Sequence, residues 1–171
     1  GGSGEIGMNM NLYAYGKEGS QKWIIVDMGV TFADDTIPGV DLIMPDPGYI
    51  IEKKDDLLGI VLTHAHEDHI GAVAHIWPEL KCKLFATPFT AALLTEKFKE
   101  KKIDISSFLK IVPLNSQIKL GDFEIDFVTL THSILEPNGL SIKTPLGTIL
   151  HTGDWKIDPN PLIGNKIDEE K

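Results

Sequence analysis

The chain reads Thr63-His64-Ala65-His66-Glu67-Asp68-His69-Ile70-Gly71 directly after a short apolar run, Leu57–Leu62. Three histidines and an aspartate therefore fall within six positions. Imidazoles and ionised carboxylates that crowd together desolvate one another, which costs free energy unless a cation gathers them. They are also the ligands that zinc and its neighbours prefer. The stretch predicts a site for a pair of divalent metal ions, and a merely polar surface loop explains the pattern poorly.

The spacing within this stretch divides its ligands into two pairs. His64 and His66 are two positions apart, so their side chains point the same way at the end of a strand. Asp68 and His69 follow where the chain turns into a helix, whose amide dipole favours nearby negative charge. We expect one pair to serve one ion and the second pair to serve an adjacent ion.

Two residues beyond this stretch also follow predicted strands and are candidate ligands. His132 comes after the apolar strand Phe123–Leu130, and Asp154 comes after the strand Thr148–His151. A carboxylate can bridge two cations with its two oxygens, so Asp154 suits a position shared by both ions. His132 alone could equally be a capping or core histidine, but the histidine stretch makes the ligand role the better interpretation.

Two further residues are candidates for supporting the ligands. Asp27 ends the predicted strand Trp23–Met28, and it could orient a ligand or the backbone of the histidine stretch. The alternative for Asp27, a simple turn residue before Gly29, is nearly as good. His151 ends a strand three residues before Asp154, so we expect it to contact a ligand and not the metal itself.

Composition limits the class of protein. The 171 residues suit a single domain, and 42% hydrophobic with 24% charged residues is ordinary for a soluble globular protein. No apolar stretch approaches the roughly 20 residues that span a bilayer, so we expect no membrane partner. The single cysteine, Cys82, excludes an intrachain disulfide and fits a reducing compartment, which points to the cytoplasm. The formal charge of −9 argues against a surface that coats nucleic acid, although a bound metal pair would add local positive charge.

Turn residues and apolar runs predict a layered α+β or α/β domain in which strands outnumber helices. Met8–Tyr15 and Lys22–Met28 form a predicted hairpin, and Asp34–Tyr49 is a predicted loop. Its acids Asp34, Asp35 and Asp41 could hold a hard cation, but a solvated acidic loop is the better interpretation. The predicted helices are Asp68 to Ile76, ended by Pro78, and Pro88 to about Lys102. The other predicted strands are Leu57–Leu62, Lys83–Ala86, Leu109–Pro113, Gln117–Leu120, Phe123–Leu130, Gly139–Thr144 and Thr148–His151.

These residues carry a resemblance to a known family. The stretch from His64 to His69 matches the HxHxDH signature of the metallo-β-lactamase superfamily. Asp27, His132 and Asp154 fall where that superfamily places its strand-end Asp, third His and bridging Asp. Within the β-CASP nuclease branch, the chain resembles the ribonuclease J family. The segments that carry this closer resemblance are Gly4–Asn9, His64–Gly71, His132–Ile134, Thr144–Thr148 and His151–Lys156, in the same order.

The resemblance implies an αββα sandwich, of which this chain would form mainly the first half. Residues 1–171 would be the N-terminal part of a metallo-β-lactamase domain, with the inserted β-CASP domain and the C-terminal region absent. The Gly-Gly-Ser-Gly start without Met and the charged run Lys166 to Lys171 agree with a fragment. The last metal-ligand His of the family would lie after Lys171. We therefore expect a weak second metal site and poor activity in this fragment.

The resemblance also implies how the ligands are used. His64, His66 and His132 would hold one ion, Asp68 and His69 the other, and Asp154 would bridge them. The cofactor would be zinc, at two sites in the full-length protein, with manganese possible. A water activated between the ions would attack a phosphodiester, and Asp68 would be catalytic by holding that water or accepting its proton.

The implied function is a metal-dependent ribonuclease of the ribonuclease J type, a 5′–3′ exonuclease and endonuclease in RNA decay and maturation. Its partner would be RNA, and the full-length protein would be a homo-oligomer in the cytoplasm. One alternative is another hydrolase of the superfamily, acting on thioesters or lactones, which the glycine-rich start and the HTGDW segment disfavour. The other alternative is a non-catalytic subunit of an RNA-processing complex, in which eroded ligands would be expected.

Overall fold

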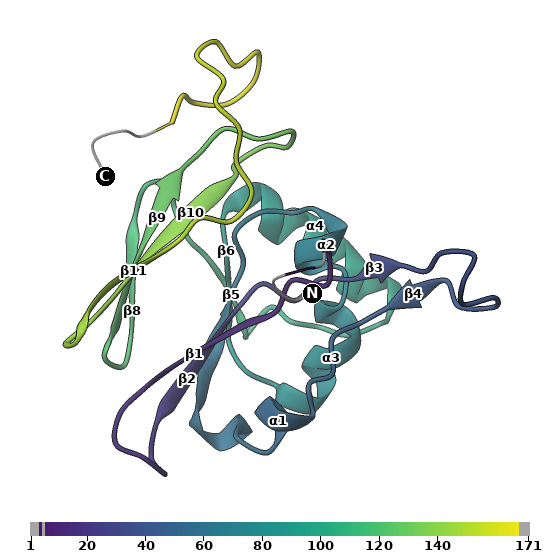
Figure 1. Ribbon diagram of the computed structural model, residues 1–171. Helices are drawn as coiled ribbons and strands as arrows, with labels where there is room; N and C mark the ends of the chain where they lie inside the picture. The colour runs from purple at the N-terminus through teal and green to yellow at the C-terminus, as the bar shows by residue number, and fades with distance from the viewer. Residues whose placement is uncertain (1–3, 5, 168–171) are drawn as a thin grey trace.

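The computed structural model describes residues 4 and 6–167. A layer of helices, a five-stranded sheet and a four-stranded sheet follow one another across the molecule (Figure 1). The first sheet has the order β1 (Asn11–Tyr15), β2 (Lys22–Val26), β5 (Leu57–Val61), β6 (Leu84–Ala86) and β7 (Leu109–Ile111). The second sheet has the order β11 (Gly147–His151), β10 (Asn138–Thr144), β9 (Phe123–Thr129) and β8 (Gln117–Leu120). The helices are α1 (Gly48–Ile51), α2 (Glu67–Ile70), α3 (Val73–Leu80), α4 (Pro88–Glu100) and the 3₁₀ turn η1 (Lys54–Asp56).

Two apolar cores lie on the two faces of the first sheet. Side chains alternate across a strand, so Ile25 on β2 packs in the core under the helices. Its neighbours Ile24 and Val26 pack in the core between the two sheets. The β2, β5, β6 and β7 strands run parallel, and β5 and β6 are covered on both faces, which explains why Leu57–Leu62 is a continuous apolar run. The predicted layered α+β class is confirmed.

This topology brings strand ends together at one edge. β2 and β5 are parallel neighbours, so the residues that follow them, Asp27 and the histidine stretch, meet at the same edge of the first sheet. The second sheet joins this edge at Asn138, whose backbone N–H donates to the carbonyl of Thr63 at 3.2 Å. The helices of the described part of the chain all lie on the face of the first sheet that points away from the second sheet (Figure 1). The first half of an αββα sandwich requires this arrangement.

The predicted end of a helix at Pro78 is wrong. The segment forms two helices, α2 and α3, and α3 continues through Pro78 to Leu80 before Lys81 ends it with a φ of 47°. Burial of Trp77 and Leu80, together with a hydrogen bond of 2.8 Å from Trp77 Nε1 to the Cys82 carbonyl, offsets the bond that proline removes.

The predicted loop from Asp34 to Tyr49 also contains regular structure. β3 (Thr31–Phe32) pairs with β4 (Leu42–Ile43) in a small antiparallel ribbon, and α1 begins at Gly48. Tyr49 stacks edge-on against Trp23 of β2 with ring centroids 5.4 Å apart. The predicted loop therefore contains a short paired ribbon and a helix that packs against β2.

Residues 1–3, 5 and 168–171 lie outside the described residues, so the Gly-rich start and most of the closing charged run are not described. Within the described range, no helix has the length and apolar character needed to cross a membrane. Cys82 is buried, and its burial raises the pKa of the thiol to about 12, so it stays protonated at neutral pH.

Candidate metal centre

The histidine stretch leaves β5 at the buried edge of the first sheet. Thr63 and His64 are completely buried, and His66 is the extended residue directly before α2. Asp68 and His69 then lie in this four-residue helix, so the ring of His69 turns back toward that of His64, with the ring centroids 4.0 Å apart.

Asp27 holds this stretch from the neighbouring strand. Its Oδ1 accepts the backbone N–H of Thr63 at 2.8 Å, and its Oδ2 accepts both the Thr63 hydroxyl and His69 Nδ1 at 2.8 Å. A carboxylate can only accept, so the Thr63 hydroxyl donates to Asp27. That hydroxyl in turn accepts from His64 Nδ1, 3.0 Å away. Asp27 thus fixes Nδ1 as the protonated nitrogen of both imidazoles, which leaves each Nε2 lone pair facing the site.

Two groups of side chains converge on this edge. The ligand atoms of His64, His66 and His132 lie within 4.8 Å of one another, and those of His64, His69 and Asp154 do the same. His66 Nδ1 is 3.1 Å from His64 Nε2 and 3.2 Å from His132 Nε2. Three ring nitrogens that face one another, with the His64 nitrogen an acceptor, fit a cation better than they fit a hydrogen-bond network.

Asp154 lies between the two groups. Its Oδ1 is 3.4 Å from His69 Nε2 and its Oδ2 is 3.7 Å from His132 Nε2. Asp68 Oδ2 approaches the same His69 nitrogen at 3.5 Å. The two oxygens of Asp154 therefore face different ligand groups, which is the arrangement of a carboxylate that can be shared by two ions. The residues present fit a pair of divalent ions.

Local electrostatics lower the pKa of two of these histidines and raise that of a third. Burial, followed by the charges of His69, His66 and His132, lowers the pKa of His64 to about 2. Burial also lowers the pKa of His132. For His69, burial alone would lower the pKa, but the hydrogen bond and charge of Asp27 together with the other carboxylates outweigh it and raise the pKa. His64 and His132 are thus neutral at physiological pH, as metal ligands must be.

The structure brings all six predicted ligands together and places the two predicted supporting residues behind them. His151 accepts or donates a hydrogen bond at Nδ1 with the Tyr13 hydroxyl at 2.9 Å, and its Nε2 lies 4.0 Å from Asp27 Oδ2. The acids Asp34 and Asp41 belong to no group that could hold a metal within the described part of the chain.

Sequence reasoning missed several residues that build the site. Thr63 relays the effect of Asp27 to His64, and its position directly before the first histidine was the only available signal. A Cβ on Gly29 would lie 1.6 Å from the carbonyl oxygen of Asp68, so only glycine fits there. The buried Asn138 donates through Nδ2 to the Thr63 carbonyl at 3.1 Å and so ties the second sheet to the histidine stretch.

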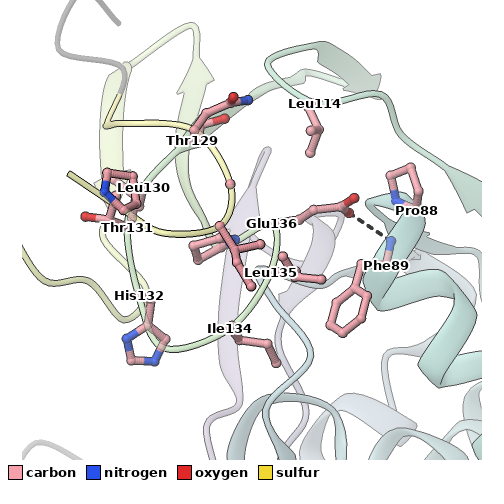
Figure 2. Close-up of a pocket in the computed structure, with 15 residues that line it drawn as sticks. Pro88, Phe89, Leu114, Thr129, Leu130, Thr131, His132, Ile134, Leu135 and Glu136 are labelled. Carbon is pink, nitrogen blue, oxygen red and sulfur yellow. Dashed lines mark hydrogen bonds between the residues drawn. The ribbon is translucent and has the colours of Figure 1, made fainter. Parts of the chain in front are cut away.

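A cavity of about 480 Å³ opens beside His132 (Figure 2). It lies between the start of α4 and the loop that joins β9 to β10, and Phe89, Ile134 and Leu135 are among its lining residues. Glu136 accepts the backbone N–H of Phe89 at 2.8 Å and links the two walls. The cavity gives a substrate room next to the ligand cluster.

Comparisons with known proteins identify the family of the chain. The sequence model of the family described as the metallo-beta-lactamase superfamily matches residues 10–162. Ribonuclease J of Sinorhizobium meliloti is 46% identical over 173 aligned residues, which cover 100% of this chain and 30% of that protein. Ribonuclease J of Helicobacter pylori is 42% identical over 163 residues, which cover 95% of this chain and 23% of that protein. The chain therefore spans less than a third of the length of these relatives.

A solved structure agrees on the fold. The metallo-beta-lactamase fold protein YhfI from Bacillus subtilis superposes with a TM-score of 0.53 and 16% identity, over 85% of this chain and 55% of that one. At this identity the likeness concerns the fold alone. It confirms the predicted architecture, in which the two sheets pack face to face behind the candidate metal centre.

Proposed function

The chain belongs to the metallo-β-lactamase superfamily, and from this premise we propose that it carries the metal centre of an RNA-cleaving hydrolase of the ribonuclease J type. The observation that carries the proposal is the 42–46% identity to ribonuclease J of two bacteria over 95–100% of this chain. The convergence of six candidate ligands supports it, because a relative that had lost catalysis would be expected to lose ligands.

We propose zinc as the native metal, with manganese as the alternative. His64, His66 and His132 would hold one ion, Asp68 and His69 the other, and Asp154 would contact both. Imidazole-rich sites favour zinc, whereas carboxylates also suit manganese. Bound divalent ions lower the pKa of water and stabilise the charge on the attacking and leaving oxygens of a phosphodiester.

Asp68 is the proposed proton acceptor. Its carboxylate is 31% exposed and faces the Nε2 nitrogen of the buried His69, so it borders both solvent and the ligand cluster. A carboxylate at such a boundary can hold a water molecule and take its proton as the phosphorus is attacked. His64, with its pKa lowered to about 2, cannot take up that proton near neutral pH.

The substrate, the compartment and the assembly of the full-length protein are predictions. We expect the protein to act on RNA in the cytoplasm as a homo-oligomer, with an inserted β-CASP domain and a C-terminal region in the full-length protein. We expect both 5′–3′ exonucleolytic and endonucleolytic cleavage, as in the family it resembles.

The test compares substrates with the natural full-length protein. After chelation and reloading with zinc or manganese, we expect hydrolysis of a labelled 5′-monophosphorylated RNA and none of a thioester or a lactone. Asp68→Ala should lower the rate at least about 100-fold, as loss of a general base does. Asp158→Ala is the matched control, because in the described structure this half-buried carboxylate pairs with Lys156 and the backbone N–H of Asn160 and with no candidate ligand.

Two results would contradict the proposal. Hydrolysis of a thioester or lactone without hydrolysis of RNA would assign the chain to another activity of the superfamily. A protein that binds no divalent ion and hydrolyses nothing would be the non-catalytic subunit.

A further inference from the structure

The segment Gly7-Met8-Asn9 is shaped to place Asn9 against the ligands of the second ion. Gly7 and Met8 have left-handed φ angles of 96° and 49°, and such angles are uncommon for a residue with a side chain. The turn delivers the backbone N–H of Asn9 to the carbonyl of Asp68 at 3.0 Å. The carbonyl of Asn9 accepts the N–H of Gly29 at 2.9 Å. Asn9 is therefore held between α2 and the segment that follows β2, both of which border the site.

The side chain of Asn9 contacts both residues assigned to the second ion. Its Nδ2 donates to the backbone carbonyl of Asp68 at 3.1 Å and approaches the carboxylate oxygen Oδ2 of Asp68 at 3.4 Å. The same Nδ2 lies 3.1 Å from His69 Nε2. The backbone carbonyl oxygen and Oδ2 of Asp68 can only accept hydrogen bonds, and the proton on His69 Nδ1 is already donated to Asp27. The side-chain NH₂ group of Asn9 therefore faces these two oxygens and His69 Nε2.

We propose that Asn9 is a positioning residue that sets the affinity of the second ion without being its ligand. The inference rests on the proposed function only in the assignment of Asp68 and His69 to one ion. Among the described residues, Asn9 is the hydrogen-bond donor to the Asp68 carboxylate, and it holds Oδ2 on the side of His69 Nε2.

Asp68 needs such a donor because little else constrains its side chain. It is 31% exposed and lies in a helix of four residues. Without Asn9, the carboxylate is free to turn into solvent, and this rotation would have to be reversed on each binding event. His69 does not need the same help, because Asp27 already fixes its ring.

The test is stepwise zinc titration of the natural full-length protein by calorimetry, together with the visible spectrum of the cobalt-loaded form. In Asn9→Ala, we expect the affinity for the second ion to fall about 10–100-fold, as loss of a contact behind a ligand usually causes. The affinity for the first ion and the melting temperature of the metal-free protein should not change. Asn11→Ala is the matched control, since this asparagine lies two positions away on β1 and makes no side-chain hydrogen bond in the described structure.

Three results would overturn the proposal: equal loss of both affinities, no loss of either, or a wild-type protein that binds only one ion. Equal loss would mean that Asn9 merely supports the backbone. If Asn9→Ala does not fold, Asn9→Ser keeps a polar residue in the turn but is too short to reach Asp68 Oδ2, and the same selective loss is expected. Because no RNA enters the measurement, its outcome is independent of whether RNA is the substrate.

Discussion

The candidate metal centre has two halves that differ in how they are held. The inner half, His64 and His69, is at most 2% exposed and is fixed by Asp27 and Thr63. The outer half, His132 and Asp154, is 19% and 44% exposed, and the side-chain polar atoms of these two residues pair only with other candidate ligands in the described structure. The inner ligands are therefore organised before any ion binds, whereas the outer ligands depend on the ion for their order.

The largest effect should come from Gly29, which lies directly behind the inner half. In Gly29→Ala, the new Cβ would overlap the backbone of Asp68, so we expect a loss of about 4 kcal/mol or more in the free energy of unfolding. Denaturant titration of the metal-free protein measures it. The control is Gly39→Ala, where no atom lies within 4 Å of the added Cβ and a φ of 85° alone should cost about 1 kcal/mol. Equal losses in the two variants would show that the inner half is not tightly packed.

Asp27→Ala should remove the support of the inner half. The substitution leaves the buried N–H and hydroxyl of Thr63 and the ring N–H of His69 without an acceptor. We expect the free energy of unfolding of the metal-free protein to fall by about 3 kcal/mol. Asp126→Ala, which removes a hydrogen bond to the exposed Gln117, should cost less than about 0.5 kcal/mol. A similar cost in both variants would contradict the role given to Asp27.

Metal removal should distinguish the two halves directly. A divalent ion at about 100 times its dissociation constant should stabilise the protein by about 2.7 kcal/mol. After chelation, we expect amide exchange to accelerate most in residues 130–137 and 152–156, which carry the outer half. Residues 63–70 should keep most of their protection, because Asp27 holds them without an ion. Uniform acceleration across the site would contradict the division into two halves.

The smallest effect is the dependence of stability on pH. The pKa of His64 is about 2 in the native protein, well below its ordinary value, so only the unfolded chain takes up this proton as the pH falls below about 6.5. The metal-free protein should therefore lose stability toward acid, by up to about 1.4 kcal/mol per pH unit from this group.

His69 acts in the opposite sense, because its raised pKa contributes stability that is present at acid pH and lost as the pH rises. Comparing the wild-type protein with His64→Asn between pH 5 and 7 isolates His64, since His69 is present in both. The free energy of unfolding should change less steeply with pH in the variant than in the wild-type protein. An unchanged slope would show that His64 titrates normally.

Local patterns predicted much of the fold and of the inner half. Leu57–Leu62 is recognisable as a buried strand because it is apolar on both faces. β5 ends at Val61, so His64 and His66 lie beyond the strand, yet His64 Nε2 and His66 Nδ1 face each other at 3.1 Å. The Pro78 prediction failed because burial of Trp77 outweighed the local cost of proline, which no local rule contains. Asp27 had two nearly equal interpretations, since its three hydrogen bonds come from residues 36 and 42 positions away.

The sequence by itself determined the chemistry of the site: a divalent metal cluster in a metallo-β-lactamase domain, because ligand type and spacing are local properties. Only the tertiary structure decided which residues hold those ligands. Asn9 and Gly29 contact Asp68 across separations of 59 and 39 positions. They do so because the parallel strands β2 and β5 end at the edge of the sheet where the antiparallel strand β1 begins. Such contacts depend on the path of the backbone through space, and no short stretch of sequence records that path.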